Sequence, residues 1–320
     1  MMENIPLLPD QASTFAADVD LLFFALLGIS GLITAGVVTA IVIFIVRYRR
    51  GSDAPRGAAP INTLKLEAVW IIIPFVLSMG IYVWAASLYF QMFRPPDDAL
   101  EISVVGQQWM WKFQHPEGQR EINELHVPVG RPVKLLLISQ DVIHSFYVPA
   151  FRIKQDALPG QYTTVWFEAT RPGEYHLFCA EYCGTDHAKM VGTVIALDPA
   201  GYQQWLAEQD GGPSVASAGE QLFLDLGCQS CHRPPGAAAE GQRRAPSLVG
   251  LFGTSVTLAS GETVTADEGY IRRSILNPQA QIVAGFRPIM PTYEGQVSEE
   301  DLTALIGYIR SLENGNSENE

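Results

Sequence analysis

Residues 179–190 read Cys-Ala-Glu-Tyr-Cys-Gly-Thr-Asp-His-Ala-Lys-Met, and this segment decides which fold and which chemistry the chain is built around. It holds two thiols, an imidazole and a thioether, and a second imidazole, His144, lies upstream in the stretch Asp-Val-Ile-His. Thiolates, imidazoles and thioethers are soft ligands that select copper or an iron–sulfur cluster over hard cations. We therefore take this segment as a candidate metal-binding loop.

The flanking sequence predicts an all-β domain. Short alternating or β-branched runs are separated by Pro-Gly and Gly-Arg-Pro turns, and they cover residues 102–105, 133–138, 162–167 and 190–196. This pattern is typical of a β-sandwich or barrel, where a Cys/His/Met ligand set indicates a copper electron-transfer site and disfavours iron–sulfur. We predict the sandwich over residues 96–208, with a short closing helix around residues 202–207.

The spacing of the two cysteines predicts two metal ions. A mononuclear copper site of this kind uses one cysteine, so Cys183, four residues after Cys179, implies two coppers bridged by two sulfurs. His144 and His187 would each cap one copper, and Met190 follows in the same loop. The alternative is a disulfide between the two cysteines in an oxidising compartment.

A second motif, Cys228-Gln-Ser-Cys231-His232, is the attachment sequence of c-type haem. Both thiols of such a motif add to the haem vinyl groups, and the adjacent histidine ligates the iron. Met290 is the candidate second axial ligand, because it is the one methionine downstream of the motif and methionine opposite histidine raises the reduction potential. The alternatives are a thioredoxin-like redox pair, which lacks a βαβ context, and half of a zinc site, which lacks a further Cys/His pair.

The region around this second motif is predicted to be helical. An amphipathic run at 219–226 precedes the motif, and Ser298 with Asp301 forms a capping-box signature ahead of an apolar helical face. Residues 209–217, with their Gly, Pro and Ser, are predicted as a linker. The helical domain then covers residues 218–314, followed by a tail at 315–320.

Two nearly uncharged stretches precede the sandwich, at residues 19–46 and 66–93, and each exceeds the roughly 20 residues that cross a bilayer. We therefore predict a transmembrane hairpin within residues 1–95. By the positive-inside rule the connector is cytoplasmic, so both chain ends lie outside. The acidic N-terminus, with Glu3 and Asp10, disfavours a secretory signal peptide. The charges of the connector are Arg47, Arg49, Arg50, Arg56 and Lys65 against Asp53 and Glu67.

The composition agrees with a membrane protein and excludes one class of partner. Hydrophobic residues make up 48% of the 320 residues, and charged residues make up 17%. A formal net charge of −13 leaves no basic surface for nucleic acid and favours partners with a positive patch. All four cysteines lie in the two motifs, so none remains for a long-range disulfide. The histidines outside the motifs, which we predict to be surface or hydrogen-bonded structural residues, are His115, His126 and His176.

Taken in order, the motifs resemble cytochrome c oxidase subunit II. The resemblance rests on the loop 179–190, the segment 144–149, the run Lys-Gln-Asp-Ala-Leu-Pro-Gly at 154–160 and the aromatic stretch Gly-Gln-Gln-Trp-Met-Trp at 106–111, and it covers the spans and the β domain. It implies a cupredoxin fold that carries a binuclear copper A centre. The family also uses the carboxylate at Glu181 for a magnesium ion at a subunit interface. The implied copper ligands are His144, Cys179, the backbone carbonyl of Glu181, Cys183, His187 and Met190.

Two more residues acquire roles from this resemblance. Trp109 takes the place of the aromatic through which electrons reach the family's copper, and the alternative is an ordinary packing tryptophan. Glu67, followed by Trp70 and Pro74, resembles the start of the family's second span, where a glutamate lies at the mouth of a proton pathway. The alternative here is a charged helix end that faces water and has no function.

Residues 216–312 resemble class I cytochromes c, so the whole chain resembles subunit II of a caa-type haem–copper oxidase. The implied fold class is a multidomain membrane protein with a two-helix transmembrane hairpin, an all-β cupredoxin sandwich and an all-α cytochrome c domain. The implied activity is that of a proton-translocating cytochrome-c oxidase. This chain would pass electrons from its covalent haem c to copper A and on to subunit I, which reduces oxygen to water. All six histidines lie outside the spans, so the oxygen-reducing centre belongs to another chain.

The resemblance also implies partners and a location. The partners are oxidase subunits I and III and an electron donor, either a soluble cytochrome c or a quinol–cytochrome c reductase complex. The location is a bacterial plasma membrane, with the N-terminus and the metal domains on the periplasmic or outer side. Two other functions stay open: a membrane-anchored copper chaperone or redox sensor would bind one copper, and a quinol oxidase subunit II would lack the paired cysteines and His187.

Overall fold

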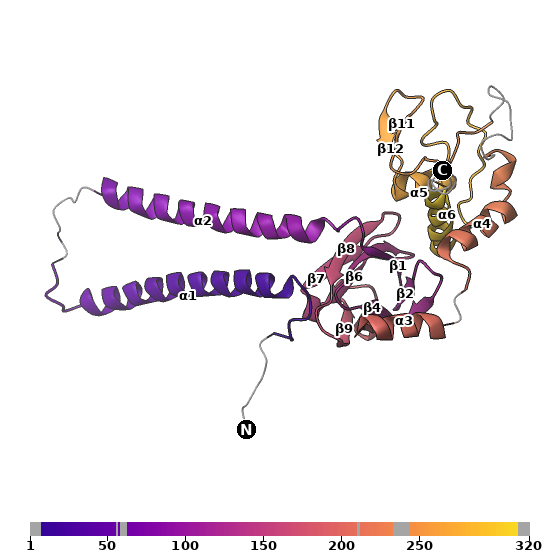
Figure 1. The fold of residues 1–320 in the computed structure, drawn as a ribbon. Coiled ribbons are helices and arrows are strands. Elements are labelled where there is room, and N and C mark those ends of the chain that lie inside the picture. The colour runs from indigo at the N-terminus through magenta and orange to yellow at the C-terminus, as the bar shows by residue number, and fades with distance from the viewer. Residues whose placement is uncertain (1–7, 56, 58–62, 210–211, 233–243, 313–320) are drawn as a thin grey trace.

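The computed structural model describes residues 8–55, 57, 63–209, 212–232 and 244–312, which form a long helical hairpin, a β-sandwich and a C-terminal helical domain (Figure 1). The predicted roles of Glu3 and Arg56, residues 210–211 of the predicted linker and the predicted tail 315–320 lie outside these described residues.

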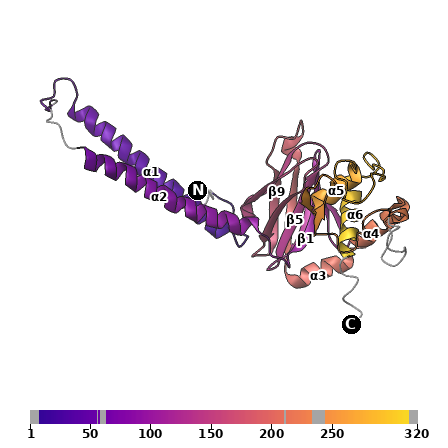
Figure 2. The same ribbon diagram turned by 90° about the horizontal axis from the view of Figure 1, so that it is seen from above.

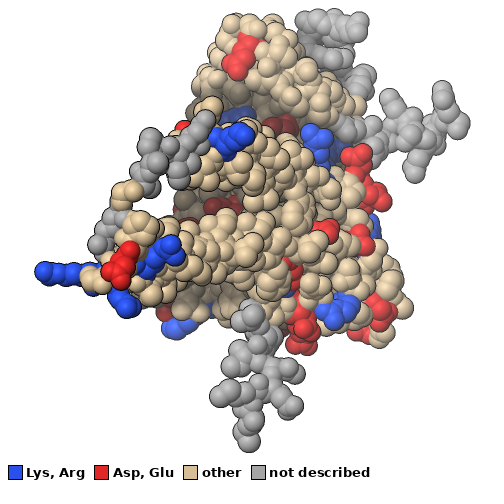
Figure 3. All heavy atoms as spheres, turned by 90° about the vertical axis from the view of Figure 1, so that its left-hand side faces the viewer, with Lys and Arg blue, Asp and Glu red and all other residues tan. Residues whose placement is uncertain are grey.

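Two long apolar helices form the hairpin. They are α1 (Ala16–Arg47) and α2 (Leu64–Phe93), which contain the two predicted spans and have the length and hydropathy to cross a membrane. Their apolar side chains are exposed along most of their length, as expected for surfaces that contact lipid or other membrane helices. Figure 3 looks at the hairpin from its tip, where blue Lys and Arg side chains gather, while acidic side chains are scattered over the domains behind.

An ion pair joins the hairpin to the sandwich. Asp20, near the start of α1, accepts hydrogen bonds from Nε and Nη2 of Arg152 at 2.8 and 2.9 Å, and both side chains are almost buried. Ring contact between Phe15 and Trp166, with centroids 4.6 Å apart, adds a second connection. The hairpin therefore continues into the folded domain through packed side chains.

The sandwich consists of two five-stranded sheets. The first has the order β3-β2-β1-β5-β8 and the second the order β4-β10-β9-β6-β7, and each contains one parallel pair, β1 with β5 and β4 with β10. The four predicted strand runs correspond to β1, β5, β8 and β10, with Tyr162 and Met190 each one residue before its strand, so those strands are confirmed. The strands are β1 (Leu100–Gln107), β2 (Met110–Gln114), β3 (Arg120–Ile122), β4 (Glu124–Pro128), β5 (Pro132–Ser139), β6 (His144–Val148), β7 (Ile153–Ala157), β8 (Thr163–Glu168), β9 (Gly173–Cys179) and β10 (Val191–Leu197).

The space between the sheets is filled by large side chains. Trp111, Phe146, Phe151 and Phe167 are fully buried there, and the rings of Trp111 and Phe146 meet edge to face, as aromatic quadrupoles prefer. Helix α3 (Pro199–Glu208), capped by the carboxylate of Asp198, closes the domain where a helix around residues 202–207 was predicted. The sandwich thus has a complete core of its own.

The C-terminal domain is built around two crossing helices. Helix α4 (Val215–Asp225) contacts α6 (Glu299–Ser311) so closely that a Cβ on Gly219 would lie 1.9 Å from the carbonyl oxygen of Ala304. The predicted capping box at Ser298 is confirmed. Helix α4 begins at Val215, inside the predicted linker 209–217. The other elements are the 3₁₀ turn η3 (Cys228–Ser230), the hairpin β11 (Ser255–Thr257) with β12 (Thr263–Thr265), and α5 (Glu268–Leu276).

Candidate metal centres

The first centre forms where three strands of the second sheet end or begin. His144 is the first residue of β6, Cys179 is the last residue of β9, and Met190 directly precedes β10. The antiparallel pairing of β9 with β6 and β10 brings the loop 179–190 back to His144, with Phe146 opposite Cys179. His187 lies within this loop, at the start of the 3₁₀ turn η2 (His187–Lys189). Sheet topology therefore gathers donors that are far apart in the sequence.

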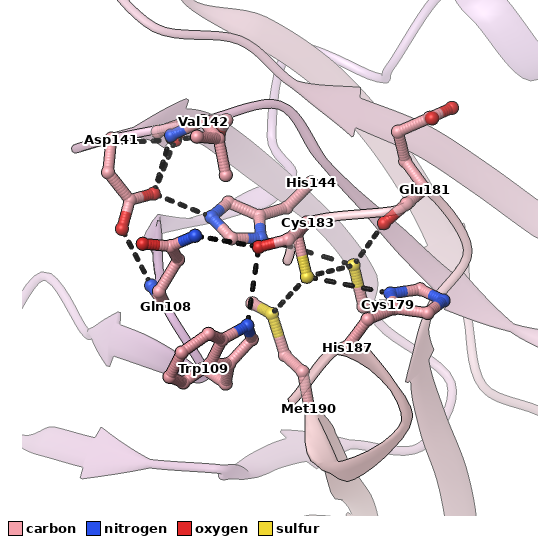
Figure 4. A network of polar contacts seen from close by, with 11 residues as sticks. Gln108, Trp109, Asp141, Val142, His144, Cys179, Glu181, Cys183, His187 and Met190 are labelled. Atoms are coloured by element: carbon pink, nitrogen blue, oxygen red, sulfur yellow. Dashed lines mark hydrogen bonds and ion pairs between the residues drawn. The ribbon is translucent and has the colours of Figure 1, made fainter. Parts of the chain in front are cut away.

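The donor atoms converge on the two sulfurs (Figure 4). The Sγ atoms of Cys179 and Cys183 are 3.7 Å apart. Nδ1 of His144 lies 4.0 Å from the first sulfur, and Nδ1 of His187 lies 3.5 Å from the second. The thioether sulfur of Met190 lies 3.8 Å from Cys183. Each sulfur thus has one histidine beside it, in the arrangement that a sulfur-bridged pair of metal ions requires.

The cysteines of this centre are free thiols. Their separation exceeds the roughly 2.05 Å of a disulfide bond. His144, Cys179 and Cys183 are buried, and one ligand atom from each lies within 4.8 Å of the others. The site is therefore a copper A-type ligand cluster, and the disulfide alternative does not describe this structure.

The two thiols differ in acidity. Burial raises the pKa of Cys179, but hydrogen bonding to His144 and to backbone groups outweighs burial and lowers this pKa to about 6. Burial and the neighbouring Cys179 sulfur raise the pKa of Cys183 to about 12. The pair therefore loses one proton readily. It loses the second only when a strong positive charge, such as that of a pair of metal cations, stabilises the second thiolate.

The backbone carbonyl of Glu181 also faces the sulfurs. It accepts a hydrogen bond from the Cys179 thiol at 3.2 Å. The carboxylate of the same residue points away from the sulfurs in Figure 4, and its Oε1 accepts a hydrogen bond from the backbone N–H of Tyr182 at 3.2 Å. Carbonyl and carboxylate are thus separated, so one can face the copper cluster while the other faces outward.

Asp141 is a residue of this site that the sequence analysis missed. Its Oδ1 lies 2.7 Å from Nε2 of His144, so Nδ1 is left to face the sulfurs. Its Oδ2 accepts a hydrogen bond from the backbone N–H of Gln108 at 2.8 Å. Burial opposes ionisation, yet these hydrogen bonds hold the pKa of Asp141 below its ordinary value. The spacing Asp-x-x-His was a signal for this carboxylate–histidine pair, because it brings both side chains to one turn.

Gln108 and Trp109 form hydrogen bonds to the metal-binding loop 179–190. Nε2 of Gln108 and Nε1 of Trp109 both donate to the carbonyl oxygen of Cys183, at 2.8 and 3.2 Å. The Trp109 ring is partly buried against the sandwich core. Trp109 is therefore connected to a cysteine of the cluster through one hydrogen bond and that residue's own backbone.

The second centre is a cavity of about 500 Å³ in the C-terminal domain. Cys228, Cys231, His232 and Met290 all line this one cavity, although Met290 is far from the others in the sequence. Core side chains of α4, α5 and α6 complete its walls, among them Phe223, Tyr270, Ile271, Leu305 and Ile309. A largely apolar cavity with two thiols and two soft axial donors fits a covalently attached haem.

His232 is oriented for metal binding. Nδ1 lies 3.0 Å from the carbonyl oxygen of Pro246, so this nitrogen carries the proton and donates. Burial lowers the pKa of His232, which keeps the ring neutral at physiological pH. A neutral ring with Nδ1 occupied presents Nε2 as the free donor.

The remaining predicted residues lie elsewhere. Glu67 is exposed in the first turn of α2, and this helix begins at its end away from the sandwich (Figure 1). His115 and His126 lie on either side of the Glu121 carboxylate, with His115 Nε2 2.8 Å from Oε1 and His126 Nδ1 in contact with Oε2. These two histidines are hydrogen-bonded structural residues, as predicted. His176 is exposed on β9.

Comparison with protein families divides the chain in the same way. The family described as cytochrome c oxidase subunit II, transmembrane domain, matches residues 3–88, and the family described as its periplasmic domain matches residues 119–197. The cytochrome c family matches residues 216–313.

Curated relatives extend over most of the chain. A cytochrome c oxidase subunit 2 from Alkalihalophilus pseudofirmus is 33% identical over 298 residues, which cover 89% of this chain and 84% of the relative. A protein of the same name from Thermostichus vulcanus is 32% identical over 278 residues, covering 69% of this chain and 85% of the relative. Among solved structures, the periplasmic domain of subunit II of cytochrome oxidase from Bradyrhizobium japonicum is 30% identical, with a TM-score of 0.34, and covers 36% of this chain and 95% of that one.

Proposed function

Because the chain belongs to the cytochrome c oxidase subunit II family and ends in a cytochrome c domain, we propose that it relays electrons from a covalent haem c through copper A to subunit I. Subunit I would then reduce oxygen to water, as in a caa-type oxidase. The observation that carries this proposal is the convergence of two free cysteine sulfurs, two imidazoles and a thioether on one buried cluster.

We assign the ligands of each cofactor as follows. Cys179, Cys183, His144, His187, Met190 and the carbonyl of Glu181 would hold the pair of copper ions. Cys228 and Cys231 would attach the haem covalently, and His232 and Met290 would ligate its iron. When bound, the haem iron and the copper pair each take up and release a single electron.

The protein side chains position these groups and keep water away. Asp141 fixes the His144 ring, and Gln108 and Trp109 hold the carbonyl of Cys183. Cys183 and Met190 are only 2% and 1% exposed, so bulk water has little access to the sulfurs. Rigid ligands and a dry site limit the rearrangement that accompanies a change of charge.

Three further assignments follow from the family resemblance. Trp109 is the aromatic through which an external donor reaches copper A, which its hydrogen bond to Cys183 supports. Glu67 lies at the mouth of a proton pathway, which its exposed place at the start of α2 supports. The outward-facing Glu181 carboxylate is a magnesium ligand toward subunit I. The other partners would be subunit III and a soluble cytochrome c or a quinol–cytochrome c reductase complex, with the metal domains outside a bacterial plasma membrane.

Metal analysis of the full chain, purified in detergent, tests the relay. We expect two coppers per haem iron and an EPR spectrum in which one unpaired electron couples equally to two copper nuclei. A copper chaperone or sensor would bind at most one copper per haem, and a non-metal homologue would bind none. Either result would remove the relay as an explanation.

A further inference from the structure

The outer face of the first sheet is covered, although it points away from the sandwich core. Side chains alternate along a strand, so Leu135 and Leu137 of β5 face the core while Leu136 and Ile138 face outward. Yet the outward pair is only 7% and 1% exposed, and Val105, beside Ile138 on β1, is 4% exposed. The continuous apolar run at 135–138 is typical of a strand that is buried on both faces.

The C-terminal domain lies over this outer face. Helix α6 contacts both β1 and α5, and Figure 2 shows the two helices on the side of the sheet that contains β1 and β5. Thr303, on the same stripe of α6 as Glu299 and Arg310, is buried. The apolar residues Val105, Leu136 and Ile138, which we call the sheet patch, therefore lie under the cytochrome domain.

Ion pairs between the domains surround the sheet patch. Lys112, opposite Val105 on β2, donates to Glu300 of α6 at 2.8 Å. Glu101, on β1, binds both Arg310 of α6 and its strand neighbour Lys134, the latter at 2.8 Å. Burial opposes the ionisation of Glu101 and Glu300, but the cations beside them hold both pKa values below the ordinary value. The cations and anions of the two surfaces are thus complementary.

A second contact lies at the edge of the sheet, where the loop before β8 meets α5. Tyr162 of this loop packs against the apolar core of the cytochrome domain. Arg272 of α5 donates to the carbonyl of Gly160 at 3.3 Å, while its guanidinium also binds Glu299 at 2.5 Å. The side chains of Arg272 and Glu299 are only 13% and 12% exposed. An aromatic anchor and an arginine that is held in place by a carboxylate of its own domain are features of a specific interface.

A third contact involves the segment that joins the domains. The backbone N–H of Val215 donates to the carbonyl of Pro116 at 3.2 Å. Gly118, with φ at +103°, approaches Gly212 and Pro213 so closely that a Cβ would lie 2.6 Å from each of their carbonyl oxygens. The start of the C-terminal domain is therefore bound to the sandwich before α4 begins.

From these three contacts we propose that the cytochrome domain is clamped on the outer face of the first sheet and stays there during electron transfer. The alternative is a domain that swings on its linker and meets the copper centre only in passing. A single exposed ion pair contributes little, but the two pairs described here act together with the apolar patch, and the linker keeps the cytochrome domain at high effective concentration near the sheet. The docked cytochrome domain also prevents a soluble electron donor from binding the outer face of the first sheet.

Lysine labelling of the full, cofactor-loaded chain in detergent tests the clamp. An amine-reactive acylating reagent is used, and the labelling rate of each lysine is read by mass spectrometry. Lys112 and Lys134 have side chains 30% and 22% exposed, against 48% and 76% for Lys154 and Lys189, which also form ion pairs but lie outside the interface. We expect the interface pair to react several-fold more slowly than the outside pair, which serves as the internal control.

Charge reversal should open the clamp. We expect Glu300→Lys to raise the labelling of Lys112 and Lys134 by about fivefold, the factor for loss of one moderately strong ion pair. Lys112→Glu, which leaves the cytochrome domain unaltered, should also raise the labelling rate of Lys134. The double variant Lys112→Glu/Glu300→Lys should return Lys134 to its slow rate. Glu262→Lys, an equal charge change at an exposed site on the β11–β12 hairpin, is the matched control and should change neither rate.

The readout does not depend on the proposed relay, because the lysines report docking whatever the electrons do. If Lys112 and Lys134 react as fast as Lys189 in the unaltered chain, the domain is not held on the sheet. The same conclusion follows if neither charge reversal accelerates labelling. Loss of copper or haem with the labelling pattern intact would instead count against the relay and leave the clamp standing.

Discussion

The copper cluster and the haem cavity bind their metals in contrasting ways. In the cluster, Cys179 ends strand β9 and Cys183 lies in the loop that follows, in a sandwich core made mainly of other side chains. Each sulfur lies 3.5 to 4.0 Å from its neighbouring side-chain donor atoms. In the C-terminal domain, His232 and Met290 lie on loops around a cavity of about 500 Å³, and the cavity walls are the side chains of the domain core. The contrast indicates that copper binds to a finished scaffold, whereas haem is itself part of a core.

The largest effect should follow from removing the haem attachment. In Cys228→Ser/Cys231→Ser we expect no covalent haem and loss of the cytochrome domain's cooperative thermal transition. At about 24 cal/mol per Å³, a cavity of about 500 Å³ corresponds to at most about 12 kcal/mol, comparable to the whole stability of a domain. Calorimetry of the full chain checks this, and survival of that transition without haem would contradict the proposed contrast.

Removing one bridging sulfur should have a large but local effect. We expect Cys179→Ser to abolish copper binding while the haem spectrum and the calorimetric transition of the sandwich stay nearly unchanged, because the ligands are a small part of a core filled mainly by aromatic and aliphatic side chains. Copper-to-iron ratios and calorimetry measure both. If the haem spectrum disappears together with the copper, the two centres are not independent, and the comparison fails.

A smaller effect is expected from the carboxylate that orients His144. Asp141→Asn should weaken copper binding by about 10- to 100-fold, because an amide holds the imidazole less firmly than a carboxylate does. Competition with a copper chelator measures the affinity. Asp186→Asn, which changes a carboxylate in the same loop that pairs with Lys189, is the matched control and should leave the affinity unchanged. Equal losses in the two variants would mean that Asp141 has no special role.

The smallest effect concerns acid stability of the sandwich. Burial raises the pKa of Glu121, but hydrogen bonds to His115 and His126 outweigh it and hold the folded-state value below 4.5. The carboxylate therefore stabilises the fold above pH 4.5, and this contribution is lost as the pH falls through the lowered pKa. We expect Glu121→Gln to lose about 1 to 3 kcal/mol at neutral pH and to show a flatter decline in acid.

Unfolding of the full chain as a function of pH checks this last prediction. The sandwich transition should respond and the cytochrome transition should not, because Glu121 lies in β3 of the sandwich. Glu174→Gln, at an exposed carboxylate on β9, serves as control. A parallel pH dependence for Glu121→Gln and the unaltered chain would contradict the assignment.

Several elements were predictable because their cause is local. The two spans follow from length and hydropathy, and the α6 start follows from Ser298 and Asp301, which cap one another across a single turn. The strand runs at 133–138 and 190–196 are likewise visible as apolar or β-branched patterns. By contrast, the apolar run at 135–138 also indicated that both faces of its strand are buried, but from the sequence it was predicted only as a strand. A pattern shows that a face is covered but does not identify what covers it.

The ligand types were set by the sequence alone, because two thiols, an imidazole and a thioether in one loop have few other uses, and Cys-x-x-Cys-His has fewer still. Tertiary structure decided which distant groups join them. Pairing of β6 with β9 brings His144, with Asp141 behind it, to the Cys179 sulfur 35 residues away. The cytochrome domain's place on the first sheet depends likewise on charges such as Lys112 and Glu300, 188 residues apart. Local spacing fixes which atoms can bind a metal, but only long-range packing brings those atoms within reach of each other.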